Sequence, residues 1–581
     1  MSDTNYVAVI DQDKVTDEVK QLAINFDPLN RSGGQGFHVD DNGELHIDDD
    51  KVMEAHKIVE HKTTGDAIRI IPLASRTGQL IHQYGQNGFS LHGTAVPQFG
   101  RTVGLIGENG IGKSTALQIV AGLLNPNFGG DVQEGYEALH KEYKGSEAQE
   151  FFEALSQEDI SVAYKPQQVD SIPKRFNGTV ADLLSSADER GVKKGVVEDL
   201  ALDSVLERPV EDLSGGELQR VAIAAASMKD VDLYLFDEPT SYLDVKQRLK
   251  VSRFIRSLTK DGDAVMVVEH DLIVLDDLTD LVHVIYGESN AYGVCSQAKT
   301  SKRGVNEYLD GYLDDEHVRF RDQYISFDER SKQRHPDSTV LTEWSEFKHS
   351  YDSFSLNVDA GDIRQKDVIG VLGENGIGKS TLMKALAGEI DTGVDLSTVD
   401  ISHKPQHLED PDTLVRIYLQ GFDSYRHTVV NPLSIEPLLD EKVSTLSGGQ
   451  LQRVAIAKCL IQDADIYLLD EPSAYLDVTQ RLSASKAIRD VMDRRETAAV
   501  VIDHDLLFLD YIANRLLVFD GEPGVHGHAH GPLSMAEGMN QFLEDLGVTF
   551  RRDERNNRPR INKPGSQKDK EQKRNGTYYY T

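Results

Sequence analysis

Short apolar runs alternate with amphipathic helical patterns through most of this chain. Runs such as 102–106, 233–236, 265–268 and 368–372 are almost free of polar residues. Continuous apolar runs of this length are typical of strands buried on both faces of a sheet, and the 3.6-residue pattern after them predicts covering helices. The alternation predicts an α/β fold for residues beyond about 76.

The first 75 residues follow a different pattern. Alternating apolar and polar positions predict strands at 6–10, 44–47 and 67–71, and helical spacing predicts helices over 15–26 and 51–61. Strands and helices mixed in this way indicate a separate small α+β domain.

The α/β part contains a large internal repeat. The stretch GENGIGKST occurs at 107–115 and again at 373–381, and each copy sits between an apolar run and a helical pattern. Lys-Pro-Gln ending at Gln167 and Gln406, LSGGxLQR at 213–220 and 446–453, and an Asp-Glu pair follow in the same order. Two copies of this series predict two tandem domains of one fold.

A difference in spacing locates an insertion. Lys113 and Lys379 are 266 residues apart, whereas the LSGG motifs and the Asp-Glu pairs are each 233 apart, so the first repeat holds 33 extra residues. Residues 136–155 account for part of the excess and predict two short helices around Lys144-Gly145. A contact surface is the favoured interpretation of this insert, and simple padding is the alternative.

Two similar connectors, 304–321 and 538–552, follow the two repeats. The second leads into residues 551–574, the one strongly basic stretch of the chain. Two interpretations stay open: a solvated disordered tail, or a contact with RNA phosphates.

Composition narrows the class of protein. The 581 residues are too many for one core and indicate about three or four domains. Neither an apolar run of about 18 residues nor a signal-peptide pattern is present, so we expect a cytoplasmic protein. Cys295 and Cys459 lack the neighbours of a metal site or disulfide framework.

The net charge of −34 is spread along the chain. It argues against a uniformly basic nucleic-acid-binding surface. Distributed acidity resembles that of proteins from salt-loving organisms, in which molar salt screens the repulsion between surface charges. An ordinary acidic cytosolic protein is the alternative.

The repeated GENGIGKST has the strand–loop–helix setting of a phosphate-binding loop. Its glycines let backbone N–H groups turn towards phosphates, and the helix after it presents its positive end to the same anion. Lys113 and Lys379 would reach the β- and γ-phosphates of ATP, and Ser114 and Ser380 would bind Mg²⁺. The predicted ATP-binding loop residues are Gly107, Asn109, Gly110, Gly112, Lys113, Ser114, Thr115, Gly373, Asn375, Gly376, Gly378, Lys379, Ser380 and Thr381.

The Asp-Glu pairs complete a hydrolytic site. Asp237 and Asp470 would hold Mg²⁺, and Glu238 and Glu471 would polarise the attacking water as general base. Consecutive strand residues point to opposite faces, so such a pair can divide these duties only at a strand end. The remaining predicted catalytic residues are Gln167 and Gln406, which would also contact Mg²⁺, and His270 and His504, which would contact the γ-phosphate.

Ser-Gly-Gly at the start of a helix is a second anion-binding geometry. A domain whose phosphate loop already binds one nucleotide needs this second site only if it contacts a different nucleotide. The whole series resembles ABC-type ATPase domains, in which two domains sandwich two ATPs head to tail. The resemblance implies that Ser214 and Gly216 close on the nucleotide held by Lys379. It implies the same of Ser447 and Gly449 for the nucleotide held by Lys113.

The resemblance extends to one subfamily. Residues 237–249, 291–293, 470–477, 550–553 and 558–563 are similar to the ribosome-recycling ABC ATPases of subfamily E, the RNase L inhibitor family. It covers the chain from about Thr77 to the C-terminus. It implies that Tyr84 and Phe89 stack on one adenine, and Tyr351 and Phe354 on the other.

The N-terminal domain departs from that family, whose members begin with a ferredoxin-like domain holding two [4Fe–4S] clusters on eight cysteines. The approximate cysteine positions here are Val15, Val19, Ala23, Asp27, Met53, His56, Val59 and Thr63. Thiolates hold such clusters, so we expect no iron–sulfur cluster and expect the apolar substitutes to fill the space by packing.

These observations predict five parts: a degenerate ferredoxin-like domain (1–75), nucleotide-binding domain 1 (76–300), a hinge (301–325), nucleotide-binding domain 2 (326–535), and a second hinge with the basic tail (536–581). The family resemblance implies an ATPase whose closure separates ribosomal subunits and which stays on the small subunit until hydrolysis. Release factors are further implied partners, and we expect a monomer.

Two other functions stay open. One is a translation regulator that binds ribosomal subunits without splitting them, since the missing cysteines weaken the splitting role. The other is the ATPase of a membrane transporter, against which the fused pair and the basic connector argue.

Overall fold

The structure, a computed structural model, describes residues 6–63, 67–73, 78–130, 135–145, 147–322, 324–325, 327, 338–351, 353–392, 394, 399–406, 408–409 and 411–580. The chain forms two compact units. Unit 1 comprises residues 1–241, 251–270 and 278–325, and unit 2 comprises 242–250, 271–277 and 326–581. None of the described helices combines the length and apolarity needed to cross a bilayer.

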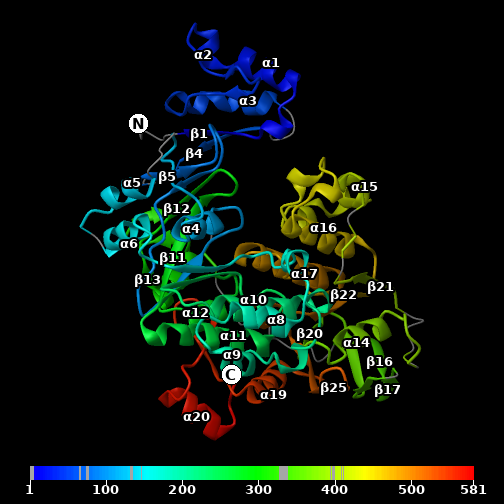
Figure 1. Cartoon of the computed structure of the whole chain (residues 1–581). Coiled ribbons are helices and arrows are strands. Elements are labelled where there is room, and N and C mark those ends of the chain that lie inside the picture. The colour runs from blue at the N-terminus through cyan, green and yellow to red at the C-terminus, as the bar shows by residue number, and fades with distance from the viewer. Residues whose placement is uncertain are drawn as a thin grey trace. The chain divides into compact units, whose positions relative to one another are not determined.

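Unit 1 begins with a small α+β part (Figure 1). β1 (Tyr6–Ile10) pairs antiparallel with β4 (Ile68–Pro72), and β2 (His38–Val39) pairs with β3 (Leu45–His46). The helices are α1 (Asp17–Phe26), α2 (Pro28–Arg31) and α3 (Lys57–Lys62). The predicted strands are present, but the helix expected over 51–61 begins only at Lys57, because the residues before it form two separate 3₁₀ turns.

A nine-stranded sheet forms the body of unit 1, in the order β5-β6-β12-β11-β7-β10-β9-β8, with β13 paired to β11. Strands β8, β9, β10, β7 and β11 run parallel, as the apolar runs predict, and β7, β9 and β10 are buried along their whole length. The strands are β5 (Leu80–Gln83), β6 (Ser90–His92), β7 (Thr102–Ile106), β8 (Val162–Lys165), β9 (Leu233–Asp237), β10 (Ala264–Val268), β11 (Leu281–Glu288), β12 (Tyr292–Cys295) and β13 (Lys299–Thr300).

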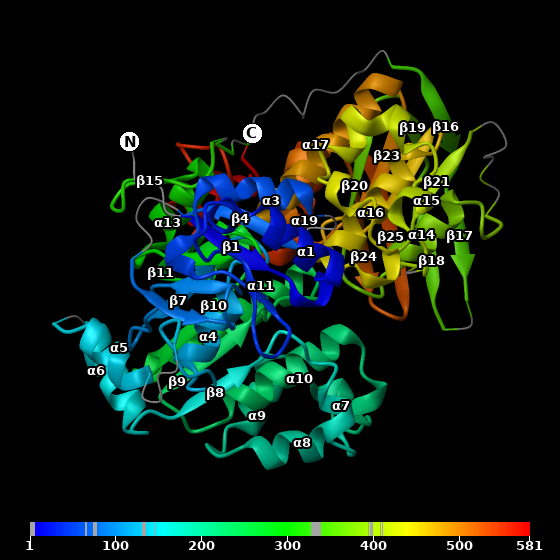
Figure 2. The ribbon, with the colours of Figure 1, turned by 90° about the horizontal axis from the view of Figure 1, so that it is seen from above.

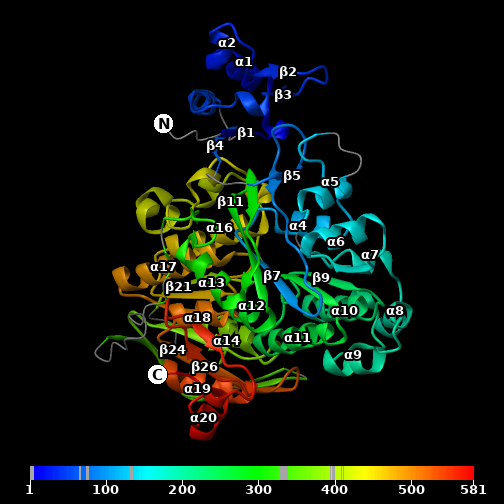
Figure 3. The ribbon, with the colours of Figure 1, turned by 90° about the vertical axis from the view of Figure 1, so that its left-hand side faces the viewer.

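The two helices predicted in the insertion are present as α5 (Gly135–Glu142) and α6 (Glu147–Ser156), which lie side by side (Figure 3). A second group of helices, α7 to α10, lies together beyond β8 (Figure 2). The helices of the first repeat are α4 (Lys113–Val120), α7 (Ile172–Arg175), α8 (Val180–Ala187), α9 (Lys193–Asp199), α10 (Gly215–Ser227), α11 (Val245–Ser257) and α12 (Leu272–Leu278).

Unit 2 is built around an eight-stranded sheet of matching order, β17-β18-β25-β24-β20-β23-β22-β21 (Figure 2). β16 (Val340–Trp344) pairs separately with β19 (Gly361–Arg364). The eight strands are β17 (Phe347–Ser350), β18 (Ser355–Val358), β20 (Val368–Leu372), β21 (Ile401–Lys404), β22 (Ile466–Asp470), β23 (Ala498–Ile502), β24 (Arg515–Glu522) and β25 (His526–Ser534). Its repeat helices are α14 (Lys379–Leu386), α15 (Val415–Tyr418), α16 (Gly448–Ile461), α17 (Val478–Arg495) and α18 (Leu506–Ile512).

Each repeat ends in a helix followed by a two-stranded hairpin, which explains why the connectors resemble each other. The first is α13 (Ser301–Asp310) with β14 (Tyr312–Leu313) and β15 (Val318–Arg319). The second is α19 (Met535–Leu546) with β26 (Phe550–Arg552) and β27 (Pro559–Ile561).

The basic stretch 551–574 is folded, so the disordered-tail interpretation is wrong. It contains the β26–β27 hairpin and α20 (Gln567–Asn575). Arg558 is fully buried, and Arg560 forms an ion pair with Asp553 at 3.1 Å. Arginines that fold this segment cannot also bind RNA, so RNA contact stays a prediction only for its exposed cations, such as Lys568 and Lys570.

A buried Asp–His pair stabilises the N-terminal part. Asp27 and His56 are both fully buried, and His56 Nε2 lies 3.2 Å from Asp27 Oδ1. The backbone N–H of Met53 donates to His56 Nδ1, which leaves the proton on Nε2 for the aspartate. Asp27 also accepts hydrogen bonds from the backbone N–H groups of Leu29 and Phe37. One carboxylate therefore joins α2, the segment after it and the turn before α3.

Asp27→Ala should destabilise residues 6–63 by about 3 kcal/mol, because it leaves a buried imidazole, the buried N–H of Phe37 and the partly buried N–H of Leu29 without their acceptor. Native-state hydrogen exchange of this segment measures the loss. Asp13→Ala, at an exposed position, is the matched control and should change stability by less than about 0.5 kcal/mol. Equal exchange protection in the two variants would show that the pair contributes nothing.

Candidate active sites in the two repeats

Each phosphate-binding loop joins a buried parallel strand to a helix, β7 to α4 and β20 to α14. Lys113 Nζ donates to the carbonyls of Gly107 at 3.0 Å and Glu108 at 2.6 Å, and Lys379 makes the matching bonds in unit 2. Each ammonium is thus held across its own loop, the position from which it can reach bound phosphates.

Glycine is required where these loops meet the helices. Gly112 and Gly378 have φ of 94° and 104°, a region that side chains disfavour. A Cβ atom on Gly112 would also lie 2.6 Å from the Phe89 ring, and one on Gly378 2.9 Å from the Phe354 ring. The predicted aromatics therefore pack against the loops, and Tyr84 and Tyr351 beside them are about half exposed.

The Asp-Glu pairs lie at the ends of β9 and β22. Glu238 and Glu471 have φ of 45° and 48°, a left-handed conformation uncommon for residues other than glycine. This turn directs each glutamate out of the strand alternation. Strain of this kind is characteristic of functional sites.

The predicted Gln and His converge on that glutamate in both units. Gln167 Nε2 donates to Glu238 Oε1 at 2.8 Å, and His270 Nε2 lies 3.4 Å from the same oxygen. In unit 2 the matching distances to Glu471 Oε1 are 2.9 Å from Gln406 and 3.6 Å from His504. Two residues far apart in each repeat therefore approach the same oxygen of one candidate general base.

Sequence reasoning missed two further residues in each repeat. Lys165 Nζ donates to the carbonyl of Asp237 at 2.9 Å, and Gln219 Nε2 donates to that of Glu238 at 2.6 Å. The counterparts in unit 2, Lys404 and Gln452, donate at 2.6 Å to the carbonyls of Asp470 and Glu471. The signal was available, because Lys-Pro-Gln and the Gln of LSGGxLQR recur in both repeats.

Burial sets the electrostatics of these groups. Burial lowers the pKa of Lys165, Lys404 and Lys379 to about 8, although neighbouring carboxylates oppose the shift. Burial, reinforced by Glu471, raises the pKa of Asp470 to about 6. Each buried carboxylate needs a compensating cation, which favours metal binding at this position.

The glutamate–histidine contact is largely buried in both units. Burial alone would raise the pKa of Glu238, but the hydrogen bond and charge of His270 outweigh it and lower that pKa to about 2. In unit 2 burial and the charge of Lys379 hold the pKa of His504 well below its usual value.

The residues fit ATP with Mg²⁺. Asp237 Oδ1 is buried and accepts no hydrogen bond from the described residues, and burial together with Glu238 raises the pKa of that carboxyl. A hydroxyl, an amide oxygen and a carboxylate are the hard donors that Mg²⁺ prefers. The residues that would hold the ion are Ser114, Gln167 and Asp237 in unit 1, and Ser380, Gln406 and Asp470 in unit 2.

The serines of the two LSGG motifs are the N-caps of helices. Ser214 precedes α10 and Ser447 precedes α16, and each accepts a hydrogen bond from the backbone N–H three residues on. Gly216 and Gly449 lie in the first turns of these helices, whose N-terminal N–H groups can bind an anion. Which nucleotide each helix meets stays a prediction.

The fold and these two sites define a tandem ABC-type ATPase. The family model described as "ABC transporter" matches residues 97–241 and 356–474. An uncharacterized ABC transporter ATP-binding protein of Methanocaldococcus jannaschii is 45% identical over 99% of this chain and 97% of its own. Translation initiation factor RLI1 of Saccharomyces cerevisiae is 39% identical over 100% of this chain and 99% of its own.

Solved structures give the same result. A structure described as a model of ribosome-bound archaeal Pelota and ABCE1 contains a chain with a TM-score of 0.93 and 45% identity, and each chain is fully covered. An archaeal ribosome recycling factor, aABCE1, in complex with ribosomal stalk protein aP1, has a TM-score of 0.83 and 48% identity over 87% of this chain and 99% of its own. The chain belongs to ABC subfamily E, the RNase L inhibitor (ABCE1) family, and it is an ATPase.

Replacing Lys165 or Lys404 with methionine should lower the turnover of that site at least tenfold, a loss of about 1.4 kcal/mol of transition-state stabilisation. Each change removes the ammonium that fixes the Asp-Glu carbonyls. Single and combined variants should be compared in steady-state phosphate release. ATP affinity, measured in parallel, should change less than about threefold and so reports on folding. The partly exposed Lys229, paired with Glu189, gives the control Lys229→Met. Unchanged turnover in the combined variant would remove this role.

Proposed function

We propose that this ATPase binds ribosomes in the cytoplasm and uses nucleotide-driven closure of its two nucleotide-binding domains to split the subunits or hold the small subunit. The observation that carries this proposal is the match along the whole of both chains, at a TM-score of 0.93, to a protein described as ribosome-bound ABCE1. The match includes the helical insert and both connectors, which ATP hydrolysis alone does not need.

Hydrolysis in this proposal uses the residues that converge in each repeat. Lys113 and the loop N–H groups bind the phosphates, and bound Mg²⁺ would neutralise their charge. Glu238, which Gln167 and His270 hold at its oxygen, takes the proton of the attacking water. Ser447 and Gly449 would complete this site on closure, and Ser214 and Gly216 would complete the other.

We propose that the N-terminal domain works without iron–sulfur clusters. None of the eight expected ligand positions is cysteine. Val19, Ala23 and Val59 are buried in the core of this domain, and Asp27 and His56 are paired with each other. Such a donor set does not fit a [4Fe–4S] cluster, which needs four thiolates.

The second candidate function is subunit binding without splitting. The altered N-terminal domain favours it, since the family resemblance gives that domain the movement that accompanies splitting and the contact with release factors. We also propose the five-part division at 75, 300, 325 and 535; the first boundary falls outside the described residues.

Sedimentation of purified ribosomes decides between the two. With ATP in molar KCl, the protein should convert 70S particles into subunits and travel with the small subunit. With Glu238→Gln plus Glu471→Gln it should stay bound there, because closure occurs without hydrolysis.

Runs with ADP, and with Lys113→Ala plus Lys379→Ala, are the controls and should leave 70S particles intact. Binding with persistent 70S particles would support the regulator. Absence of binding with every nucleotide would refute ribosome action and leave the ATPase activity untouched.

The net charge of −34 supports adaptation to high salt. Raising KCl from 0.1 M to 2 M should raise the melting temperature by at least about 5 °C, because the salt shortens the Debye length from about 10 Å to below about 3 Å and screens repulsion between surface carboxylates. Differential scanning calorimetry at both concentrations measures this change. A melting temperature that is constant or falls with KCl would favour an ordinary acidic protein.

A further inference from the structure

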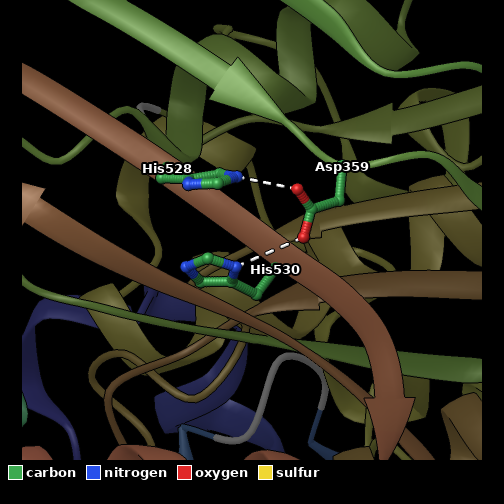
Figure 4. A group of neighbouring side chains, drawn as sticks. All are labelled: Asp359, His528 and His530. Atoms are coloured by element: carbon green, nitrogen blue, oxygen red, sulfur yellow. Dashed lines mark hydrogen bonds and ion pairs between the residues drawn. The ribbon is translucent and has the colours of Figure 1, made fainter.

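Two histidines and an aspartate meet on one face of the unit 2 sheet, in a cluster that ATP hydrolysis does not use (Figure 4). His528 and His530 are alternate residues of β25 and therefore point to the same face. Asp359 directly follows β18, which pairs parallel with β25. Neighbouring strands thus bring together three side chains separated by about 170 residues of sequence.

The donor atoms already lie close together. His528 Nε2 is 2.7 Å from Asp359 Oδ1, and His530 Nδ1 is 3.2 Å from Asp359 Oδ2. One ligand atom from each residue lies within 4.8 Å of the others, so small side-chain rotations could bring all three to an ion at about 2.0–2.2 Å. The three side chains are partly exposed, which gives an ion a path from solvent.

A fourth side chain orients the cluster. Asp520, on β24, lies 3.0 Å from His530 Nε2, on the side of the ring opposite Asp359. A carboxylate on the far nitrogen of a ligating histidine is the usual arrangement around protein-bound zinc, because it fixes the tautomer and the ring orientation.

The first repeat shows that the fold does not require these residues. Its β6–β12 pairing matches β18–β25, with Ser90 opposite Tyr292 as Ser355 is opposite His526. In that register Thr94, Val294 and Ser296 occupy the places of Asp359, His528 and His530. The same strands pair there without the cluster, so its residues are free to serve another purpose.

We propose that Asp359, His528 and His530 bind one divalent ion of the zinc class, with Asp520 as a positioning residue. Two imidazoles and one carboxylate suit Zn²⁺ and its neighbours, whereas Mg²⁺ and Ca²⁺ prefer oxygen ligands alone. Water would complete the coordination. The ion would join the end of β18 to β25, in the part of the sheet that begins just after Phe354.

Zinc titration of the full chain tests the proposal, after removal of metals with EDTA and in buffer with millimolar Mg²⁺. A chromophoric chelator should report one zinc per chain that is lost in His528→Gln plus His530→Gln. Zinc at about one hundred times its Kd should raise the melting temperature of the wild type by roughly 5 °C and leave that of the double variant unchanged. Co²⁺ should give intense visible d–d bands, which distinguish a four- or five-coordinate ion held by the protein from the weakly absorbing hexaaqua ion.

Asp520→Asn should weaken zinc binding about 10- to 100-fold and keep the cobalt bands, as expected of a positioning residue. His427→Gln, at an exposed histidine of unit 2, is the matched control and should change nothing. A second cluster, Asp40, Glu44 and His46 in unit 1, offers a single imidazole 3.6–3.7 Å from its carboxylates. Zinc that persists in the double variant, or disappears in His46→Gln, would overturn the assignment, as would a wild type that takes up none.

Discussion

The carbonyl groups of the Asp-Glu peptide hold each active site in shape. A left-handed turn at a residue other than glycine costs about 1–2 kcal/mol and persists only where the surroundings enforce it. Here Lys165 and Gln219 bind the carbonyls on either side of the turn at Glu238, and its N–H donates to Val268 at 3.0 Å. These bonds let the aspartate stay in the sheet edge while the glutamate turns towards its glutamine and histidine. This turn allows the aspartate to face the Mg²⁺ position while the glutamate faces the attacking water.

The catalytic loops and the parallel sheets could be predicted because the signals are local. An apolar run, a glycine-rich loop and a helical pattern each act within a few residues, and their duplication excludes chance. Lys165 and Gln219 recur in both repeats, but their role went unrecognised because the backbone carbonyls that they bind carry no sequence pattern. The folded state of residues 551–574 escaped for a related reason. Arg558 counts as a charge in the sequence, but tertiary packing buries it.

The N-terminal domain is held together by apolar packing around one buried polar pair. Val19, Ala23 and Val59 contribute apolar burial, which has no direction. The Asp27–His56 pair adds direction, since each of its hydrogen bonds specifies one partner. A buried pair of this kind stabilises little beyond its own desolvation cost, but removing one member is expensive. The geometry of this domain therefore depends on which groups face one another in its core, and not on one interaction of large free energy.

The two repeats serve as controls for each other. Residues that recur with the same hydrogen bonds, such as Lys165 and Lys404, serve the chemistry that both sites share. Residues that differ at matching positions of the two sheets serve a role in one unit alone. The matching strand pairing carries Val294 in one unit and His528 in the other, so the pairing itself does not require the histidine. His528 and His530 both contact Asp359, and His530 also contacts Asp520. Strands that already pair through their backbones do not need these side-chain contacts to stay together. Ligand binding gives that arrangement a physical reason.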